Sequence, residues 1–587
     1  MTNHEIAEVF KRIGDMMDIM GENRFKVLAY RRASENIEAL GKDIRVYWRE
    51  GTLEQIPGIG KAIAEKIDEL LSTGRLAFYE RLQDQVPTGV VSLLEVPDVG
   101  PKTAKLMWEQ MGLQSVAEVE TAARAGQLRA LPGLGAKSEA KILAGIEALY
   151  RRSDRIPLGT AWPVATDLVE ELWSSCPEVR QATVAGSLRR MRATIGDIDL
   201  LAASEVPSEV MRAFVALPRV AEVVLSGLTK TTVRLHNGLQ VDLRVLEPER
   251  WGAALQYFTG SQAHNIRLRE MARKQGLSLS EYGFKREDDS EILCAREEEV
   301  YGLLGLPWIP PEMREDRGEI QSARAGDLPH LVEWDNIRGD LHAHTDWSDG
   351  AGTLAEMAGA AQERGYRYLV ISDHTQSLGI ANGLTVERLR AQRSEIDALN
   401  DRWTGFRLLQ GCELEIKADG SLDFPDEVLA ELDFVLASVH TSLRQERAQI
   451  TQRVLNALRN PYVDVIGHPS GRILGQREAS AVDLDAVIEV AAETGTALEV
   501  NSIPARLDLD DVHVRRALEL GVTVAINSDA HHPGGLDSLP FGLATARRGW
   551  ATSLDVLNTL TVEDLLSWRQ ARIARQPSTK EGNHVAV

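Results

Sequence analysis

Cysteine is scarce in this 587-residue chain: only Cys176, Cys294 and Cys412 occur, and they lie far apart. This excludes a disulfide framework and a thiolate zinc site, and it is typical of proteins in a reducing cytoplasm. Runs of about 18 apolar residues are also lacking, which excludes a helical membrane span. The first residues, MTNHEIAEVFKRIG, lack a signal-peptide pattern. We therefore expect a cytoplasmic protein with no membrane partner.

Net positive charge is lacking as well, because 66 Lys and Arg stand against 87 Asp and Glu, a net charge of −21. Such an excess of acid normally argues against a polyanionic partner. The excess is uneven, however: residues 1–155 carry a net charge of −1, residues 156–320 of −6 and residues 321–587 of −14. The first two parts can therefore still present local basic surfaces to nucleic acid.

A short motif occurs three times: IPGIGKAIAEKI (56–67), VPDVGPKTAKLM (96–107) and LPGLGAKSEAKI (131–142). Each copy joins a glycine-containing turn to a helix rich in Ala and Lys, where backbone amides at the helix N-terminus can hold a phosphate. One copy could be an ordinary loop, but three resemble the helix-hairpin-helix motif. That resemblance implies binding to the DNA backbone without sequence readout. The contacts it implies are Gly58, Gly60, Lys61, Gly100, Lys102, Gly133, Gly135 and Lys137.

The second copy differs from the others because Asp98 stands where they carry Gly58 and Gly133. An acid at this position either weakens the phosphate contact or caps the following helix. Both interpretations remain open at the level of sequence.

Acidic residues cluster in the middle of the chain, where AGSLRRMRATIGDIDLL (185–201) contains Asp197 and Asp199. Residues i and i+2 of a strand face the same side, so both carboxylates project together. Asp242, in QVDLRV, is a third candidate on another strand. Such carboxylates repel one another unless cations bridge them, and two Mg²⁺ ions there would stabilise phosphoryl transfer. A solvated strand face is the alternative, which the apolar flanks disfavour.

These segments, with YFTGS (257–261), resemble the family X DNA polymerases of the polymerase beta type over about residues 1–317. The resemblance implies a DNA-directed DNA polymerase with Asp197, Asp199 and Asp242 as catalytic ligands of two Mg²⁺ (or Mn²⁺). It implies dNTPs and gapped or nicked double-stranded DNA with a 5′-phosphate as partners. Tyr257 and Phe258 would pack against the incoming sugar and exclude a 2′-hydroxyl. The other nucleotide contacts it implies are Arg155, Gly186, Ser187, Arg190, Gly196, Gly260, Asn265 and Arg269; His264 and Ile266 depart from the family pattern.

The N-terminal segments KVLAYRRASENI and GKAIAEKIDELLSTG resemble the lyase domain of the same family. The resemblance implies Lys66 as a Schiff-base nucleophile at abasic sites. Lys26, Tyr30 and Arg31 would surround the 5′-phosphate. The alternative is that Lys66 only contacts DNA phosphate, because Ala62 stands where the family has a supporting lysine. Lyase activity therefore stays an open possibility.

In the last region, apolar runs end in residues that can bind metals: GDLHAH, YLVISDH, RLLQGCELEI, DFVLASVH, VDVIGH and VTVAINSDAH. In a barrel of parallel strands, the carboxyl ends of the strands converge on one face, so these side chains are expected to meet. Imidazoles and carboxylates are ligands of divalent cations. Four histidines outside this pattern are interpreted as core or surface residues: His236, His330, His513 and His532.

The motifs H-x-H, S-D-H, G-x-E, S-V-H, G-H-P and S-D-A-H resemble the PHP (polymerase and histidinol phosphatase) family over about residues 338–535. The resemblance implies a distorted (βα)₇ barrel that holds two to three divalent metals (Zn²⁺, Mn²⁺ or Fe²⁺) and hydrolyses phosphoesters. Asp346 and Glu415 stay outside the ligand set, with Glu415 as a residue that orients a ligand. The nine ligands it implies are His342, His344, Asp349, His374, Glu413, His440, His468, Asp529 and His531.

The predicted function is gap filling in DNA repair by a bacterial-type, nucleoid-associated and monomeric enzyme, with a 3′–5′ exonuclease or 3′-end-processing activity in the last domain. Two alternatives remain: a phosphatase or pyrophosphatase acting on small phosphates, and a DNA-end-binding scaffold. The expected domains are a lyase-like helical domain (1–85), a helix-hairpin-helix domain (86–155), an α+β nucleotidyltransferase-type palm (156–245), a thumb-type nucleotide-selection domain (246–317), a linker (318–337), the PHP barrel (338–572) and a disordered tail (573–587).

Overall fold

The structure is a computed structural model, and it describes residues 3–38, 44–56, 58–96, 98–153 and 155–575. The chain forms two compact units, which are described separately. The first comprises Met1–Asp154 with the short segments Gly475–Arg477 and His532–Gly535, and the second comprises the remainder. Among the described residues, no helix has the length and apolar character needed to cross a membrane.

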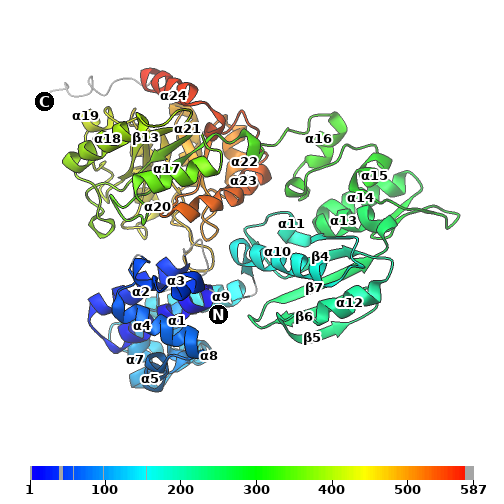
Figure 1. The fold of residues 1–587 in the computed structure, drawn as a ribbon, viewed down its shortest axis with the longest axis horizontal. Helices are drawn as coiled ribbons and strands as arrows, with labels where there is room; N and C mark the ends of the chain where they lie inside the picture. Colours follow the sequence, from blue (N-terminus) through cyan, green and yellow to red (C-terminus); the bar gives the residue numbers. More distant parts are fainter. Residues whose placement is uncertain (1–2, 39–43, 57, 97, 154, 576–587) are drawn as a thin grey trace. The chain divides into compact units, whose positions relative to one another are not determined.

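The first unit is helical, as the sequence predicted (Figure 1). Apolar residues of the first helix, such as Phe10, Ile13 and Met16, are fully buried and pack in one core with residues of the later helices. Its elements are α1 (Asn3–Met20), α2 (Arg24–Glu38), α3 (Ile44–Glu50), η1 (Leu53–Gln55), α4 (Lys61–Thr73), α5 (Ala77–Gln85), α6 (Thr88–Ser92), η2 (Leu93–Glu95), α7 (Pro101–Met111), α8 (Val116–Arg124), η3 (Leu128–Ala130) and α9 (Ala136–Ser153).

The three repeats form the same turn before α4, α7 and α9. Gly58, Asp98 and Gly133 occupy equivalent positions with φ values of 73°, 68° and 81°. This left-handed conformation suits glycine, and Asp is among the residues that tolerate it. The N-cap of α7 is Gly100, with no side-chain capping hydrogen bond. Asp98 therefore occupies the turn position of the repeat, and the N-cap position belongs to Gly100.

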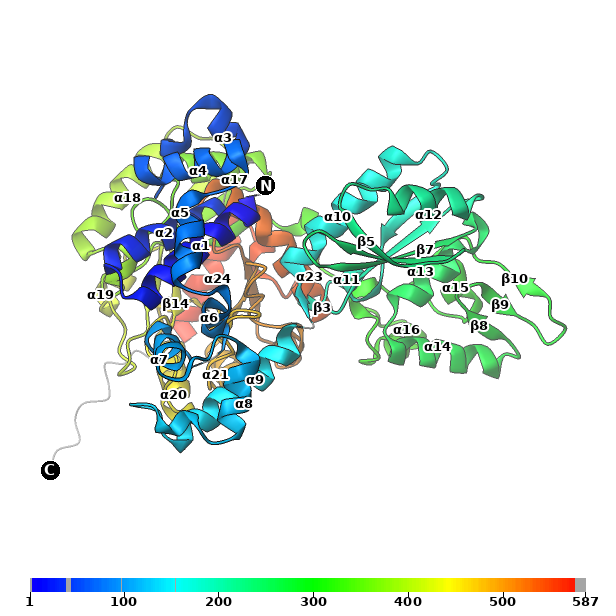
Figure 2. The ribbon, with the colours of Figure 1, turned by 90° about the horizontal axis from the view of Figure 1, so that it is seen from below.

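The second unit begins with a five-stranded sheet in the order β2-β4-β7-β6-β5, of which Figure 2 labels β5 and β7. The pair β4 and β7 is parallel and the other neighbours are antiparallel. Helices α10 and α12 contribute Leu168 and Phe214 to the core, where they pack with Leu200 of the sheet. The elements of this palm are β1 (Ile156–Pro157), α10 (Leu158–Ser175), β2 (Gln181–Val184), α11 (Gly186–Arg189), β3 (Thr194–Ile195), β4 (Ile198–Ala203), α12 (Pro207–Val215), β5 (Val220–Ser226), β6 (Lys230–Leu235) and β7 (Gln240–Leu246).

A smaller helical segment with a three-stranded sheet follows the palm. The expected linker 318–337 does not simply connect domains, because it contains α16, whose Ile320 and Ala323 are buried in the same core as Val300. This thumb-type segment contains η4 (Pro248–Arg250), α13 (Trp251–Thr259), α14 (Gln262–Lys274), β8 (Ser278–Ser280), β9 (Gly283–Lys285), β10 (Glu291–Ile292), α15 (Glu297–Leu303), η5 (Pro311–Met313) and α16 (Glu319–Ala325).

The last region forms a parallel seven-stranded sheet in the order β11 to β17. A parallel bridge joins Ala343 at the end of β11 to Ala530, just after β17, so the sheet is a nearly closed barrel. Consecutive residues of β12 pack in different cores, Leu369 in one and Val370 in the other. This is expected for a strand that is covered on both faces. The predicted (βα)₇ barrel is confirmed.

The barrel strands are β11 (Gly339–Ala343), β12 (Tyr368–Ile371), β13 (Arg407–Glu415), β14 (Phe434–Ser438), β15 (Val465–Ile466), β16 (Ala497–Asn501) and β17 (Val524–Asn527). The helices are η6 (Trp334–Asn336), α17 (Leu354–Glu363), η7 (Gly379–Ala381), α18 (Val386–Asn400), α19 (Asp426–Leu429), α20 (Arg447–Leu458), α21 (Leu484–Thr494), α22 (Asp511–Glu519), η8 (Pro533–Ser538), α23 (Leu539–Arg548), η9 (Leu557–Thr559) and α24 (Val562–Arg575). Of the expected tail, residues 573–575 continue α24, and 576–587 lie outside the described residues.

Candidate metal-dependent active sites

The palm sheet brings three carboxylates together. Asp199 of β4 and Asp242 of β7 are opposite each other in the parallel register, and Asp197 immediately precedes β4. One oxygen from each residue lies within 4.8 Å of the others. Three convergent carboxylates fit hard divalent cations, which prefer oxygen ligands. The predicted triad is therefore assembled by strand pairing.

The surroundings of the triad explain its charge state. Burial, followed by the charges of Asp197 and Asp242, raises the pKa of Asp199 to about 7. Asp242 accepts a 2.7 Å hydrogen bond from the Thr232 hydroxyl and pairs with Lys230 Nζ at 2.5 Å. Sequence reasoning missed Thr232 and Lys230, whose only signal is their place on the strand beside β7.

Gly186 is required by a close approach to the triad. Its φ is +60°, and a Cβ atom at this position would lie 2.0 Å from Oδ2 of Asp199. No L side chain fits such a gap without displacing the carboxylate. The glycine expected to contact the triphosphate thus also makes room for a carboxylate of the triad.

The remaining predicted triphosphate contacts differ in accessibility. Ser187 is half-buried at the start of α11 and Gly196 is exposed. Arg155 donates from Nε to the Thr194 hydroxyl at 2.9 Å and also to the Thr194 carbonyl. Arg190 is 8% exposed, and its guanidinium donates to Glu315 at 3.0 Å and to the Thr259 carbonyl at 2.8 Å. In this structure Arg190 thus holds the palm to the thumb-type segment.

The predicted sugar and base contacts lie on α13 and α14. Tyr257 and Phe258 pack edge to face with ring centroids 5.2 Å apart, and the Arg244 guanidinium lies 4.5 Å from the Phe258 ring centroid. Asn265 is 9% exposed and donates to the carbonyls of Tyr257 and Gly260. Asn265 therefore fixes the turn between the two helices.

The residues beside Asn265 show why the sequence departs from the family pattern. His264 is fully buried, with Nδ1 2.6 Å from a Glu319 carboxylate oxygen and Nε2 3.0 Å from the Tyr301 hydroxyl. Its partner Glu319 belongs to α16, which explains a histidine at this position. A Cβ atom on Gly260 would lie 2.5 Å from Oδ1 of Asn265. Arg269 is half-buried, and its Nε has no hydrogen-bond partner among the described residues.

In the first unit, only some of the side chains predicted to form the 5′-phosphate pocket lie near one another. Lys66 Nζ lies 6.0 Å from the Tyr30 ring centroid and 5.1 Å from that of Phe78. Arg31 instead pairs with Asp15 and Asp18 at 3.0 and 2.9 Å, which neutralises its charge. The lysines of the three repeats, Lys61, Lys102 and Lys137, are all exposed at the starts of their helices.

In the barrel, eight of the nine predicted ligands form three groups that could each hold a metal ion. His344 and His374 each belong to two groups, so the groups are contiguous. The ninth residue, His468, lies with Nε2 2.9 Å from Oε1 of Glu413. The three groups are His344, Asp349, His374 and His531; His342, His344 and Asp529; and His374, Glu413 and His440.

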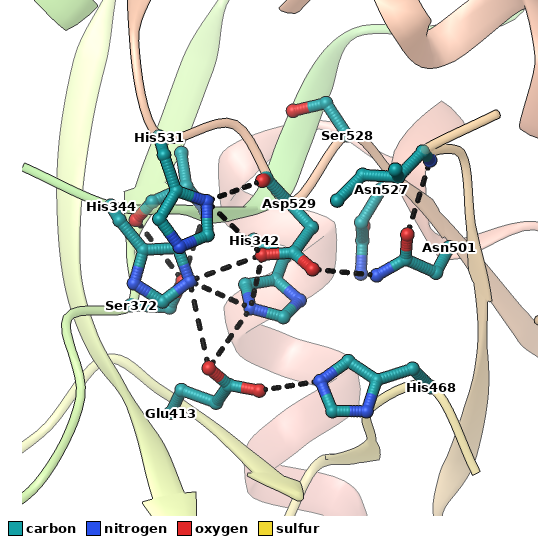
Figure 3. A network of polar contacts seen from close by, with 12 residues as sticks. His342, His344, Ser372, Glu413, His468, Asn501, Asn527, Ser528, Asp529 and His531 are labelled. Atoms are coloured by element: carbon teal, nitrogen blue, oxygen red, sulfur yellow. Dashed lines mark hydrogen bonds and ion pairs between the residues drawn. The ribbon is translucent and has the colours of Figure 1, made fainter. Parts of the chain in front are cut away.

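The centre of the barrel cluster is densely packed (Figure 3). His342 Nε2 lies 3.1 Å from His344 Nε2, and Asp529 Oδ1 lies 3.4 and 3.2 Å from these two nitrogens. Glu413 faces them from β13. His342 and His344 thus point to the same side, as their spacing of two residues predicted.

Unpaired nitrogen atoms show that the cluster fits metal ions. Nδ1 of His344 and Nδ1 of His468 are buried and have no hydrogen-bond partner among the described residues, and Nδ1 of His374 faces only Oε2 of Glu413, at 3.0 Å. Buried polar atoms normally have partners, and a metal ion supplies one for an imidazole nitrogen. Mixed imidazole and carboxylate donors fit Zn²⁺, Mn²⁺ or Fe²⁺.

Carboxylates behind the cluster fix the orientation of its histidines. Glu499 Oε1 lies 2.7 Å from His342 Nδ1, and Glu415 Oε2 lies 2.7 Å from His440 Nδ1. Such contacts set the tautomer of a metal-binding histidine and raise its basicity. The suggested role of Glu415 agrees with this geometry. Glu499 was missed, although an acid within the apolar strand ALEVN (497–501) is a usable signal.

Burial and the neighbouring charges shift the pKa values of the clustered histidines in different directions. Burial acts to lower the pKa of His342, but the carboxylates of Asp529, Glu499 and Glu413 raise it well above its usual range. Burial and the neighbouring His531 and His374 lower the pKa of His344 to about 3. A neutral imidazole such as that of His344 is the form that binds a metal.

The histidines interpreted as unrelated to the site lie outside it. No group found among the described residues includes His236, His330, His513 or His532. His236 and His330 are exposed, and His513 Nδ1 lies 2.8 Å from Asp510.

Four family models match the chain in order. They describe a helix-hairpin-helix domain (residues 1–76), a SAM-like helix-hairpin-helix tandem (90–148), a DNA polymerase beta thumb (254–315) and a PHP domain (340–503). The resemblances to the helix-hairpin-helix motif, to the polymerase beta type and to the PHP family are therefore confirmed.

Relatives share either the whole architecture or one part of it. DNA polymerase lambda of Rattus norvegicus is 26% identical over 53% of this chain and 56% of its own length. A probable phosphatase of Thermoanaerobacter sp. (strain X514) is 30% identical over 38% of this chain and 89% of its own length. The DNA polymerase/3′-5′ exonuclease PolX of Bacillus subtilis (strain 168) is 40% identical over 96% of this chain and 99% of its own length. A match of this extent, together with both sets of metal-binding side chains, places the chain in the PolX family, the family X DNA polymerases that carry a PHP domain.

Proposed function

We propose that this protein fills short gaps in DNA with its palm and removes nucleotides from 3′ ends with its barrel. The observation that carries the proposal is the presence of two complete ligand sets in one chain, the palm carboxylates and the barrel cluster. The relative that matches nearly the whole chain is named for both activities. A complete ligand set in the palm and another in the barrel favour an enzyme over a DNA-end-binding scaffold.

At the palm, Asp197, Asp199 and Asp242 would hold two Mg²⁺ or Mn²⁺ ions. Such a pair supplies stabilisation of the attacking and leaving oxygens in phosphoryl transfer. Gly186 keeps the space in which Asp199 stands, and Thr232 orients Asp242 by its hydrogen bond. Lys230 balances the charge of Asp242 until cations bind.

The nucleotide would lie between the palm and α13. Arg155, Ser187, Arg190 and Gly196 are proposed to meet the triphosphate, for which Arg190 must leave Glu315. Tyr257 and Phe258 present a rigid aromatic pair on α13, bulky enough to exclude a 2′-hydroxyl. The base and minor-groove side of this site would involve the half-buried Arg269 and the buried Asn265.

At the barrel, the nine ligands would hold two to three ions of Zn²⁺, Mn²⁺ or Fe²⁺. Clustered divalent ions supply an activated water and neutralise the charge of a phosphodiester. Glu499 and Glu415 keep the Nε2 atoms of His342 and His440 directed into the cluster by accepting from their Nδ1 atoms. The product would be a nucleoside monophosphate from the 3′ end.

The first unit would direct the protein to gapped or nicked DNA with a 5′-phosphate. Three turns of the same geometry and their exposed lysines support contacts with the DNA backbone. Lys66 beside Tyr30 is the candidate for the 5′-phosphate, and Schiff-base chemistry at Lys66 is the further possibility. We propose that the protein acts as a monomer on bacterial nucleoid DNA in the cytoplasm.

A single incubation tests the proposal. A one-nucleotide-gapped duplex, labelled at the 5′ end of the primer strand, is incubated with Mg²⁺ or Mn²⁺, with and without dNTPs. Extension with dNTPs and stepwise shortening without them are expected. Absence of extension would refute the palm assignment, and absence of shortening would refute the barrel assignment.

The second candidate for the barrel is a phosphatase or pyrophosphatase acting on small phosphates. The 30% identity with a probable phosphatase over 38% of this chain favours it. Phosphate release from pyrophosphate or from a nucleoside monophosphate, measured without DNA, distinguishes this candidate from a 3′ exonuclease.

A further inference from the structure

One arginine, Arg506, borders the ligand cluster of the barrel. Arg506 lies in the loop after β16, and its Nε is 3.8 Å from Oδ2 of Asp529. The side chain is 21% exposed and makes no hydrogen bond within the described part of the chain. Asp529 Oδ2 already accepts a 3.0 Å hydrogen bond from Asn501, visible in Figure 3. A guanidinium with unused donors therefore stands at the edge of the ligand cluster.

The neighbouring arginine, Arg472, has a different role from Arg506. Arg472 donates from Nε to the Arg506 carbonyl at 2.9 Å, donates to the Leu507 carbonyl, and lies 3.4 Å from Asp510. Its donors thus fasten the backbone of the loop. Arg506 is the cation that this arrangement presents to the cluster.

The loop itself is held rigidly. The backbone amides of Ser470 and Gly471 donate to the Asp508 carboxylate at 3.0 and 2.9 Å. The Asn501 amide donates to the Asp508 carbonyl at 2.6 Å, and the Leu509 amide donates to the Glu499 carbonyl at 2.9 Å. The segment that carries Arg506 is therefore tied at both ends to residues next to the metal-binding side chains.

The next residue anchors the loop outside the barrel. Leu507 is fully buried, and it packs in the palm core with residues such as Leu158 and Leu188. Pro504 lies so close to α10 that a Cβ atom on Gly159 would be 2.3 Å from it. Palm packing thus fixes a loop of the barrel site.

We propose that Arg506 binds the phosphodiester hydrolysed at the barrel, and that the palm core holds Arg506 in place through Leu507. A planar guanidinium matches two non-bridging phosphate oxygens. When the carboxylate of Asp529 is engaged by a metal ion, Arg506 is left to attract the anionic substrate. Arg506 is thereby a substrate-binding residue and Leu507 a positioning residue, so that the exonuclease site depends on the polymerase palm. This inference rests on the proposed function of the barrel.

The first test compares Arg506→Ala and Arg506→Lys with Arg459→Ala in the metal-loaded full-length protein. Arg459 is an exposed arginine of the same barrel, beside Thr494 and Gly521, which precede strands β16 and β17. The probe is a phosphorothioate-linked thymidine dinucleotide, whose binding is measured by calorimetry, with the metal content measured in parallel. We expect Arg506→Ala to weaken binding about 10- to 100-fold, as for the loss of a charge-assisted contact. Arg506→Lys should lose less and Arg459→Ala nothing, all with unchanged metal content.

Unchanged dinucleotide binding by Arg506→Ala, or loss of metal from it, would overturn the proposal, because Arg506 would then only balance Asp529. If the unaltered protein binds the dinucleotide through Arg506 but does not shorten 3′ ends, the proposed exonuclease function fails while the assignment of Arg506 stands.

The second test concerns Leu507, the residue that anchors the loop in the palm core. Leu507→Ala is compared with Leu172→Ala, which removes the same atoms from the same palm core on α10. Hydrogen–deuterium exchange of residues 502–509 should rise, and dinucleotide binding should fall about tenfold, only in Leu507→Ala. Leu507→Val serves if the alanine variant does not fold. Equal effects at Leu172, or no effect at Leu507, would refute the role of the palm.

Discussion

Asp199 and Asp242 stand opposite each other on the parallel strands β4 and β7, although more than 40 residues separate them in the sequence. This strand register, rather than proximity in the sequence, brings the third carboxylate into the palm triad. Two paired carboxylates beside Asp197 repel one another, and the raised pKa of Asp199 records that repulsion together with burial. The site is therefore built to receive cations.

Replacing Asp199 by Ala should abolish nucleotide addition, by about 10³-fold or more, because an electrostatic anchor of the transition state is lost. Shortening of 3′ ends should persist, since the barrel ligands are untouched. Primer extension and 3′ hydrolysis on the same labelled duplex measure both. Asp288→Asn, an exposed acid of the thumb-type segment, is the matched control. Near-normal extension by Asp199→Ala would contradict the triad.

Replacing Gly186 by Ala should reduce extension strongly while the protein stays folded. The added methyl group would lie 2.0 Å from Oδ2 of Asp199 and would force that carboxylate out of position. The positive φ adds about 1 kcal/mol of backbone strain. Gly238→Ala, a palm glycine with φ +85° where no atom lies within 4 Å of the added methyl group, is the control. Equal extension by the two variants would show that the close approach does not matter.

The requirement for Mg²⁺ in extension should depend on pH. Burial and the charges of Asp197 and Asp242 raise the pKa of Asp199 to about 7, so without metal the group keeps its proton up to that pH. The ion must displace the proton. The Mg²⁺ concentration for half-maximal extension should therefore fall by up to about tenfold for each unit by which the pH rises toward 7, and it should level off above pH 7.

The same shift predicts the effect of pH on the stability of the metal-free protein. The folded pKa of Asp199 exceeds its ordinary value of 3.8. Its contribution to stability is therefore fully present below pH 3.8 and is lost as the pH rises through about 7. Melting curves in a chelator should show this loss in the unaltered protein, and Asp199→Asn should reduce it. Identical pH profiles for the two proteins would argue against the raised pKa.

Replacing His344 by Ala should lower 3′ hydrolysis by about 10²-fold or more and spare extension. His344 belongs to two of the three groups that could hold a metal ion, so its loss removes a candidate ligand from both. His330→Ala, an exposed histidine outside the cluster, is the control. Full 3′ hydrolysis by His344→Ala would show that the barrel is not the nuclease and would favour the small-phosphate alternative for the barrel. Loss of both activities with an intact fold would show that the palm depends on the barrel ligands.

A 5′-phosphate at a one-nucleotide gap should tighten DNA binding at low salt through Lys66 and Lys26. Arg31→Ala should cost less than Lys66→Ala, because Asp15 and Asp18 already neutralise Arg31. Fluorescence anisotropy with and without the phosphate measures this, and Lys11→Ala is the control. Equal binding of the two DNAs would refute the pocket. Borohydride trapping on abasic DNA that disappears in Lys66→Ala would establish lyase chemistry separately.

The sequence determined the parts of this protein whose chemistry is local. The two-residue spacing in His342 and His344, and in Asp197 and Asp199, places each pair on one side of the chain whatever surrounds it. The turns at Gly58, Asp98 and Gly133 are likewise local, because one φ value defines each. Apolar runs that end in metal-binding residues also indicated a barrel of parallel strands, since only a converging sheet gathers such side chains.

Only the tertiary structure decided which distant groups meet. The pairing of β4 with β7 brings Asp242 to Asp199, and the barrel brings Glu499 behind His342. The expected linker became part of a core because Glu319 pairs with His264 and Ile320 is buried. Leu507, an ordinary apolar residue in the sequence, joins the core of another domain. Contacts across such separations depend on how surfaces fit after the chain has folded, and no local pattern of residues encodes them.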